Sequence, residues 1–149
     1  MGILDRIKAW FSSARRPLQD KVSFRDEVVI TLKKDGKIIK KWKVKANTWL
    51  TFGKTKVRDA LANGGFTKIG YMYVTATTGS SEKTTTNSTP AADKARFIST
   101  WPASGLIDDI TKFSIRQSTG GSNLAEITVT TFDKPDGISL EVTWDTTVS

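Results

Sequence analysis

The sequence contains no cysteine and no histidine among its 149 residues. Without cysteine the chain cannot form a disulfide, a thiolate nucleophile or a zinc–thiolate site. Without histidine it lacks the commonest general base and metal ligand, so one chain cannot assemble a Ser-His-Asp or Cys-His catalytic group. No convincing pair of carboxylates takes their place. We therefore expect a protein that is not an enzyme and that uses no cofactor and no metal.

Long apolar runs are also missing, since no stretch of about 20 apolar residues occurs and a bilayer span needs that length. Five tryptophans, seven phenylalanines and a hydrophobic fraction of 38% are nevertheless enough for a packed core. At 149 residues we expect one domain, or one domain with an arm.

The first residues carry an apolar stripe at helical spacing. The stripe comprises Ile3, Leu4, Ile7, Trp10, Phe11 and Ala14. Pro17 ends the segment, because the residue before a proline disfavours the helical conformation. We predict an amphipathic helical arm over residues 1–20 and a β-rich body over residues 21–149. A helix this short needs a surface, which could be its own body, a neighbouring subunit or assembly, or a membrane.

The body is predicted to be mainly β. Asp35-Gly36 is typical of a two-residue hairpin turn, and it lies between apolar strands at 28–32 and 38–44. Further strands are expected at 69–75, 95–101, 110–117, 125–132 and 139–144. A helix should begin near Lys54, and the Thr- and Ser-rich residues 77–93 should form a surface loop. The expected fold is an antiparallel β-sandwich or open barrel of about seven strands with one short interior helix.

Positive charge is concentrated in the first part of the chain. Residues 1–60 hold 16 Lys and Arg against 6 Asp and Glu, whereas residues 61–149 hold 7 against 9. The predicted hairpin contributes Lys33, Lys34, Lys37, Lys40, Lys41, Lys43 and Lys45. Strand alternation should place Trp42 and Val44 on one face, opposite the odd-numbered lysines. These lysines could form a solvated or aggregation-resistant edge, meet an acidic protein surface, or follow nucleic acid phosphates.

Gly53-Lys54-Thr55 is similar to the end of a phosphate-binding loop. That motif requires a glycine five residues before Gly53, where this chain has Thr48. The favoured interpretation is a turn glycine near the start of a helix.

From residue 46 onward the order of features resembles a module of tailed-bacteriophage virion proteins. The matching features are Asn47-Thr48-Trp49-Leu50-Thr51, the helix at 57–61, the strand at 69–75, the polar stretch 83–89, Lys94-Ala95-Arg96-Phe97, the strand at 127–132 and Leu140-Glu141-Val142-Thr143-Trp144. The resemblance implies a non-enzymatic structural protein of the virion, assembled in the host cytoplasm, that forms homo-oligomers and often trimers.

Within that class we expect a capsid decoration, or cement, subunit that binds the major capsid protein or another virion protein. The expected docking residues are Ile3, Leu4, Ile7, Trp10 and Phe11 of the arm, with Lys33, Lys37, Lys41 and Lys43 of the hairpin. A tail-fibre or baseplate component is an alternative, as is a module that binds nucleic acid or a membrane surface.

Overall fold

The computed structural model describes residues 2–4, 23–46, 49–64 and 68–148. Within these ranges the chain forms nine strands and the helix α2. They are β1 (Phe24–Lys34), β2 (Lys37–Ala46), α2 (Thr51–Asn63), β3 (Tyr71–Thr75), β4 (Ser81–Thr84), β5 (Thr86–Ala91), β6 (Lys94–Trp101), β7 (Ile107–Arg116), β8 (Ala125–Lys134) and β9 (Ser139–Val148). Apart from residues 2–4, the predicted arm lies outside the described residues.

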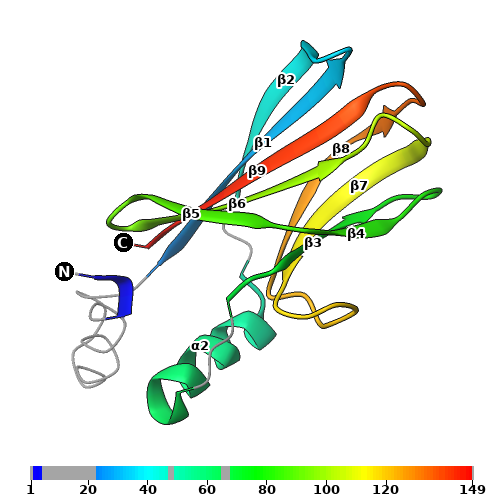
Figure 1. Ribbon diagram of the computed structural model, residues 1–149. Coiled ribbons are helices and arrows are strands. Elements are labelled where there is room, and N and C mark those ends of the chain that lie inside the picture. The colour runs from blue at the N-terminus through cyan, green and yellow to red at the C-terminus, as the bar shows by residue number, and fades with distance from the viewer. Residues whose placement is uncertain (1, 5–22, 47–48, 65–67, 149) are drawn as a thin grey trace.

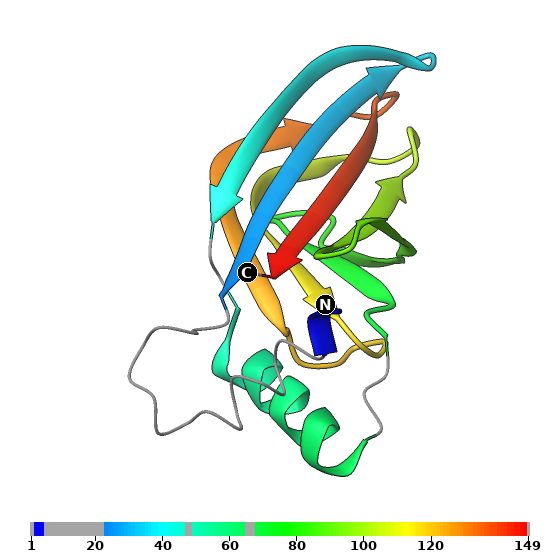
Figure 2. The same cartoon turned by 90° about the vertical axis from the view of Figure 1, so that its left-hand side faces the viewer.

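The strands form two antiparallel sheets that face each other as a sandwich (Figures 1 and 2). One sheet has the order β2-β1-β9-β6-β5, and the other has the order β4-β3-β7-β8. Helix α2 lies at one end of the sandwich, and the turn between β1 and β2 projects at the opposite end. The sandwich prediction is confirmed and the barrel alternative is not, while the expected strand number of about seven was too low.

The hairpin prediction is confirmed for β1 and β2. Asp35 and Gly36 both have positive φ, at 51° and 77°, which is the geometry of a type I′ turn. Trp42 and Val44 are half-buried and pack against the core, whereas Lys41 and its odd-numbered neighbours on β2 are exposed. The alternation in the sequence therefore assigned the two faces of this strand correctly.

The core lies between the inner faces of the two sheets. Trp101, Trp144 and Phe113 are among its largest fully buried side chains. A row of aromatic contacts crosses it: Trp101 to Phe113 with ring centroids 6.0 Å apart, Phe113 to Phe132 at 6.2 Å, and Phe132 to Trp42 at 4.8 Å. These contacts link β6 and β2 in one sheet through β7 and β8 in the other.

The prediction of one long surface loop over residues 77–93 is wrong, because these residues contain β4 and β5. All six residues of β5 are exposed, so its sequence shows none of the apolar alternation that reveals a half-buried strand. The chain crosses from one sheet to the other at Thr85, which lies between these two strands. The Thr85 amide donates to the Gly70 carbonyl at 2.9 Å, and the Asn87 side-chain amide donates to the carbonyl of Ile69.

Two turns at the hairpin end are joined by a buried lysine. Lys134 is 1% exposed, and its ammonium donates to the carbonyl of Ile138 at 2.8 Å. It also donates to the carbonyls of Ala103 and Gly105 in the turn between β6 and β7, and to that of Pro135. Burial lowers the pKa of Lys134, an effect that the nearby Asp136 carboxylate opposes.

Helix α2 begins at Thr51, earlier than predicted, and Gly53 lies inside it rather than in a turn. The N-cap residue Leu50 provides no side-chain cap, so the sequence carries no capping signal there. A Cβ on Gly53 would meet the Leu124 carbonyl oxygen and would lie 2.9 Å from Cε3 of Trp49. Gly53 thus allows the first turn of α2 to lie directly against the strand entry at Leu124.

We expect Gly53→Ala to lower the free energy of unfolding by about 2 kcal/mol, as overpacking does. The same change at an exposed helical glycine would stabilise the chain, because alanine favours the helix. Urea denaturation of the Gly53→Ala variant checks this prediction. The control is Lys54→Ala, which lies on the exposed face of α2. A Gly53→Ala variant more stable than the native chain would contradict the close approach.

Candidate docking surfaces

The described residues contain no group of three or more Asp or Glu side chains that could hold a metal ion. Among the same residues, no helix is long and apolar enough to cross a membrane. Three surfaces are candidate functional features: the hairpin tip, a groove at the α2 end of the sandwich, and a groove along the side formed by β2 and β8.

The hairpin tip exposes an apolar pair. Ile38 and Ile39 each keep 56% of their surface accessible. They follow the turn, and the pairing of β1 with β2 shifts beside them, because Leu32 is opposite Lys40 whereas Lys33 is opposite Ile38. Ile39 is thus the extra residue of a β-bulge. The tip combines two exposed isoleucines with the surrounding lysines at the far end from α2 (Figure 1).

The four lysines predicted to dock, which are Lys33, Lys37, Lys41 and Lys43, fall into two groups. Two of them, with Lys45, form ion pairs within the chain: Lys33–Glu141 at 3.7 Å, Lys43–Glu27 at 3.3 Å and Lys45–Glu27 at 3.9 Å. Lys37 and Lys41 are exposed and form no ion pair with any described residue. Glu141 lies on β9, far from Lys33 in the sequence, whereas Glu27 lies on the other strand of the hairpin; local sequence patterns indicated neither partner.

Another ion pair lies on the outer face of the same sheet, between Arg96 and Asp145. Arg96 on β6 donates from Nε and Nη2 to the two carboxylate oxygens of Asp145 on β9, at 2.7 and 2.9 Å. The hydrogen bond and then the charge of Asp145 raise the pKa of Arg96. Asp145 is buried, and this bidentate pair links β6 to β9.

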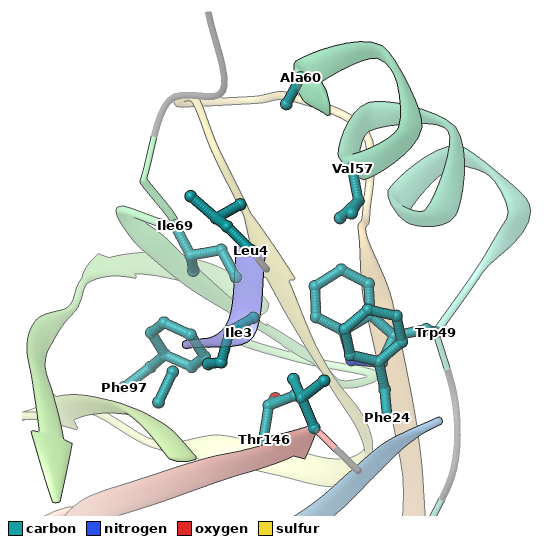
Figure 3. A pocket seen from close by; sticks show the side chains of 11 residues that line it. Ile3, Leu4, Phe24, Trp49, Val57, Ala60, Ile69, Phe97 and Thr146 are labelled. Carbon is teal, nitrogen blue, oxygen red and sulfur yellow. The ribbon is translucent and has the colours of Figure 1, made fainter. Parts of the chain in front are cut away.

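An apolar groove of about 310 Å³ lies where α2 meets the sandwich (Figure 3). Its lining residues are Ile3, Leu4, Phe24, Trp49, Val57, Ala60, Ile69, Ala95, Phe97, Thr146 and Val148. Ile3 is half-buried there and Leu4 is 60% exposed. These two arm residues therefore line the groove together with residues of their own body. Ile7, Trp10 and Phe11 lie outside the described residues, so their docking role stays a prediction.

Trp49 forms one wall of this groove and is held by two kinds of contact. Its ring stacks on Phe24 with centroids 4.8 Å apart. Its Nε1 donates to Asp26 Oδ1 at 3.3 Å, and the Thr146 hydroxyl donates to the same oxygen at 2.7 Å. Asp26 is only 3% exposed. A buried carboxylate that accepts both hydrogen bonds thus orients this tryptophan.

A third surface runs along one side of the sandwich, where β2 and β8 are the outermost strands of their sheets. A groove of about 360 Å³ lies between them. It is lined by Lys40, Trp42, Lys43, Val44, Thr128, Val129, Thr130, Thr131 and Phe132. The edge-to-face contact between Trp42 and Phe132 joins the two strands across the groove.

The structure thus brings Lys37, Lys41, Ile38 and Ile39 together on one hairpin and places Ile3 and Leu4 at the opposite end of the molecule. The arm residues and the hairpin lysines that were predicted to dock therefore lie on two separate surfaces, as far as the described residues show. Comparison of the chain with protein-family models, with curated proteins and with solved structures finds no match.

Proposed function

We propose that this chain is a non-enzymatic structural subunit that docks through the β1–β2 hairpin tip on an acidic protein surface. The observation that carries the proposal is the combination of exposed Ile38 and Ile39 with exposed Lys37 and Lys41 at that tip. Neighbouring exposed apolar side chains rimmed by charge are typical of an interaction site. Complementary charge on a partner would steer the encounter and set the orientation.

The expected energetic contributions differ between the two components. Full burial of an isoleucine is worth roughly 1.5–3 kcal/mol before the cost of ordering the interface. An exposed ion pair is worth about 0–1 kcal/mol and weakens with salt. The isoleucines would therefore supply most of the affinity, and Lys37 and Lys41 would supply orientation and association rate.

Within this class we propose a capsid decoration subunit of a virion. The support is the resemblance of the chain from residue 46 onward to virion modules, together with a single small sandwich that carries docking features at both ends. A cement subunit stabilises a shell by contacting neighbouring capsid proteins, and features at opposite ends of a sandwich suit that task. A trimeric decoration protein and a tail or baseplate subunit are versions of the same proposal.

Binding of the full chain to purified shells of its source virus tests the proposal. We expect Ile38→Ser with Ile39→Ser to weaken co-sedimentation with the shells about 100-fold, because two buried apolar side chains are lost. Phe52→Ser is the matched control, because Phe52 is a 40% exposed apolar residue on α2 at the other end. Unchanged shell binding by the double variant would contradict docking through the tip, as would tighter binding to duplex DNA or anionic vesicles than to shells.

A further inference from the structure

We propose that the acidic partner binds as an added β-strand along the free edge of β2, and that this strand alternates acidic and apolar residues. This inference rests on the proposed docking of the basic hairpin and specifies its geometry. The occupant is an extended segment of a partner protein, with carboxylates on one face and aliphatic side chains on the other.

The edge of β2 has the regular geometry that strand addition needs. β2 is the outermost strand of the five-stranded sheet, with β1 on its other side. Its pairing with β1 is unbroken from Asp26 opposite Ala46 to Leu32 opposite Lys40, and the register shift comes only after that point. In a regular antiparallel strand alternate backbone groups face each neighbour, so the outer edge offers evenly spaced donors and acceptors.

β8, the edge strand of the other sheet that lines the same groove, is less suitable for strand addition. The pairing of β7 with β8 shifts between Ile110 and Lys112, which are opposite Phe132 and Thr128. β8 therefore carries extra residues between positions 128 and 132, and such irregularities interrupt regular pairing on an edge. Both strands line the same groove, and Figure 2 shows β2 (cyan) and β8 (orange) on the same side of the sandwich. An added strand would pair with β2 and lie in front of β8.

The side chains of β2 specify the two faces of the partner strand. Trp42 and Val44 turn inward, are half-buried, and line the groove of about 360 Å³ with Val129 and Phe132. Apolar side chains of the partner would cover them and extend the core. Lys41, Lys43 and Lys45 turn outward and are exposed, and Lys43 and Lys45 share the single carboxylate of Glu27. Acidic side chains of the partner would lie opposite these three lysines, with Lys41 the one that forms no ion pair with a described residue.

Charge excludes a second copy of this edge as the occupant. Pairing of β2 with β2 of another copy would bring the lysines of both strands together, and like charges opposite each other destabilise a sheet. The same lysines prevent indiscriminate edge-to-edge association, which is the usual function of lysine on an exposed edge. An acidic strand neutralises this barrier, so protection against aggregation and selection of the partner follow from the same residues.

The full-length chain is tested with a synthetic peptide of alternating glutamate and valine as the probe. A peptide with the same composition but with its glutamates and valines in two blocks is the first control. Two further peptides carry backbone N-methyl groups, one at every glutamate and one at every valine. N-methylation removes the N–H donor and leaves the charge unchanged. Affinity is measured by fluorescence anisotropy, and the contact is located by NMR from protection of β2 amides.

We expect the alternating peptide to bind about tenfold more tightly than the block peptide. One N-methylated peptide should lose about tenfold in affinity and the other little, because only one set of amides faces β2. Lys41→Glu should weaken binding of the alternating peptide, whereas Lys54→Glu on α2 should not.

Equal binding of all four peptides would overturn strand addition and leave charge-directed docking intact. Absence of peptide binding, with shell binding still sensitive to Ile38→Ser and Ile39→Ser, would overturn strand addition alone. Displacement of the peptide by duplex DNA at much lower concentration would overturn it in favour of a nucleic acid partner. Shell binding that is unchanged by Ile38→Ser with Ile39→Ser would instead contradict the proposed function.

Discussion

Replacing Trp144 by alanine is expected to lower the free energy of unfolding by about 4 kcal/mol, near the upper end for a buried aromatic residue. Trp144 is fully buried on β9, the middle strand of the five-stranded sheet. It lies opposite Val28 of β1 on one side and Phe97 of β6 on the other. Its removal would leave a cavity where both halves of the sheet meet. Urea denaturation with an unchanged m-value provides the measurement.

A pair of phenylalanine variants separates packing from hydrogen bonding. In the described part of the chain Trp144 Nε1 has no acceptor, whereas Trp101 Nε1 donates to the Ser81 hydroxyl at 3.0 Å. Trp144→Phe should therefore destabilise the chain less than Trp101→Phe, by about 1 kcal/mol, the net value of one hydrogen bond. The reverse order would show that the Trp144 indole N–H is bonded in solution.

Replacing Lys134 by methionine is expected to lower the free energy of unfolding by about 3 kcal/mol, because carbonyls that face the buried ammonium lose their donor. The side chain is similar in length, so little packing is lost. The acceptors belong to the turn between β6 and β7 and to residues 135–138 between β8 and β9. The change should therefore loosen both turns and lower the thermal midpoint. Faster hydrogen exchange of the Gly137 amide would report the loosening of the turns.

Lys112→Met is the control for this prediction. Lys112 pairs with Glu126 at 3.3 Å, with both side chains about one-third exposed, so its loss should change stability by less than about 1 kcal/mol. A similar effect for the two methionine variants would contradict a special role for the Lys134 contacts.

Local patterns were sufficient to predict the elements whose burial is one-sided. The β1–β2 hairpin followed from Asp35-Gly36, and the last three strands followed from alternating apolar residues. β4 and β5 were missed because an edge strand is held by backbone pairing, and β5 buries none of its side chains. The start of α2 was placed too late because Leu50 lacks a capping side chain and Gly53 is typical of a turn.

The candidate site could be predicted only in part, for the same physical reason. The lysine-rich strand and its apolar partner face were visible in the sequence. The ion pairs of Lys33 and Lys43 required β9 and β1 to be placed in register. The groove between β2 and β8 required the two sheets to be stacked, since these strands are far apart along the chain. Properties that arise from long-range pairing are absent from any local window.

The central position of β9 has a consequence for biosynthesis. The five-stranded sheet consists of one hairpin, β1–β2, and a second, β5–β6, which β9 alone connects. Because β9 follows β1, β2, β5 and β6 in the sequence, ribosomal synthesis leaves the two hairpins separate until β9 has emerged. Contacts between such distant segments form slowly. Emergence of β9, and not completion of the two hairpins, should therefore determine when this sheet closes.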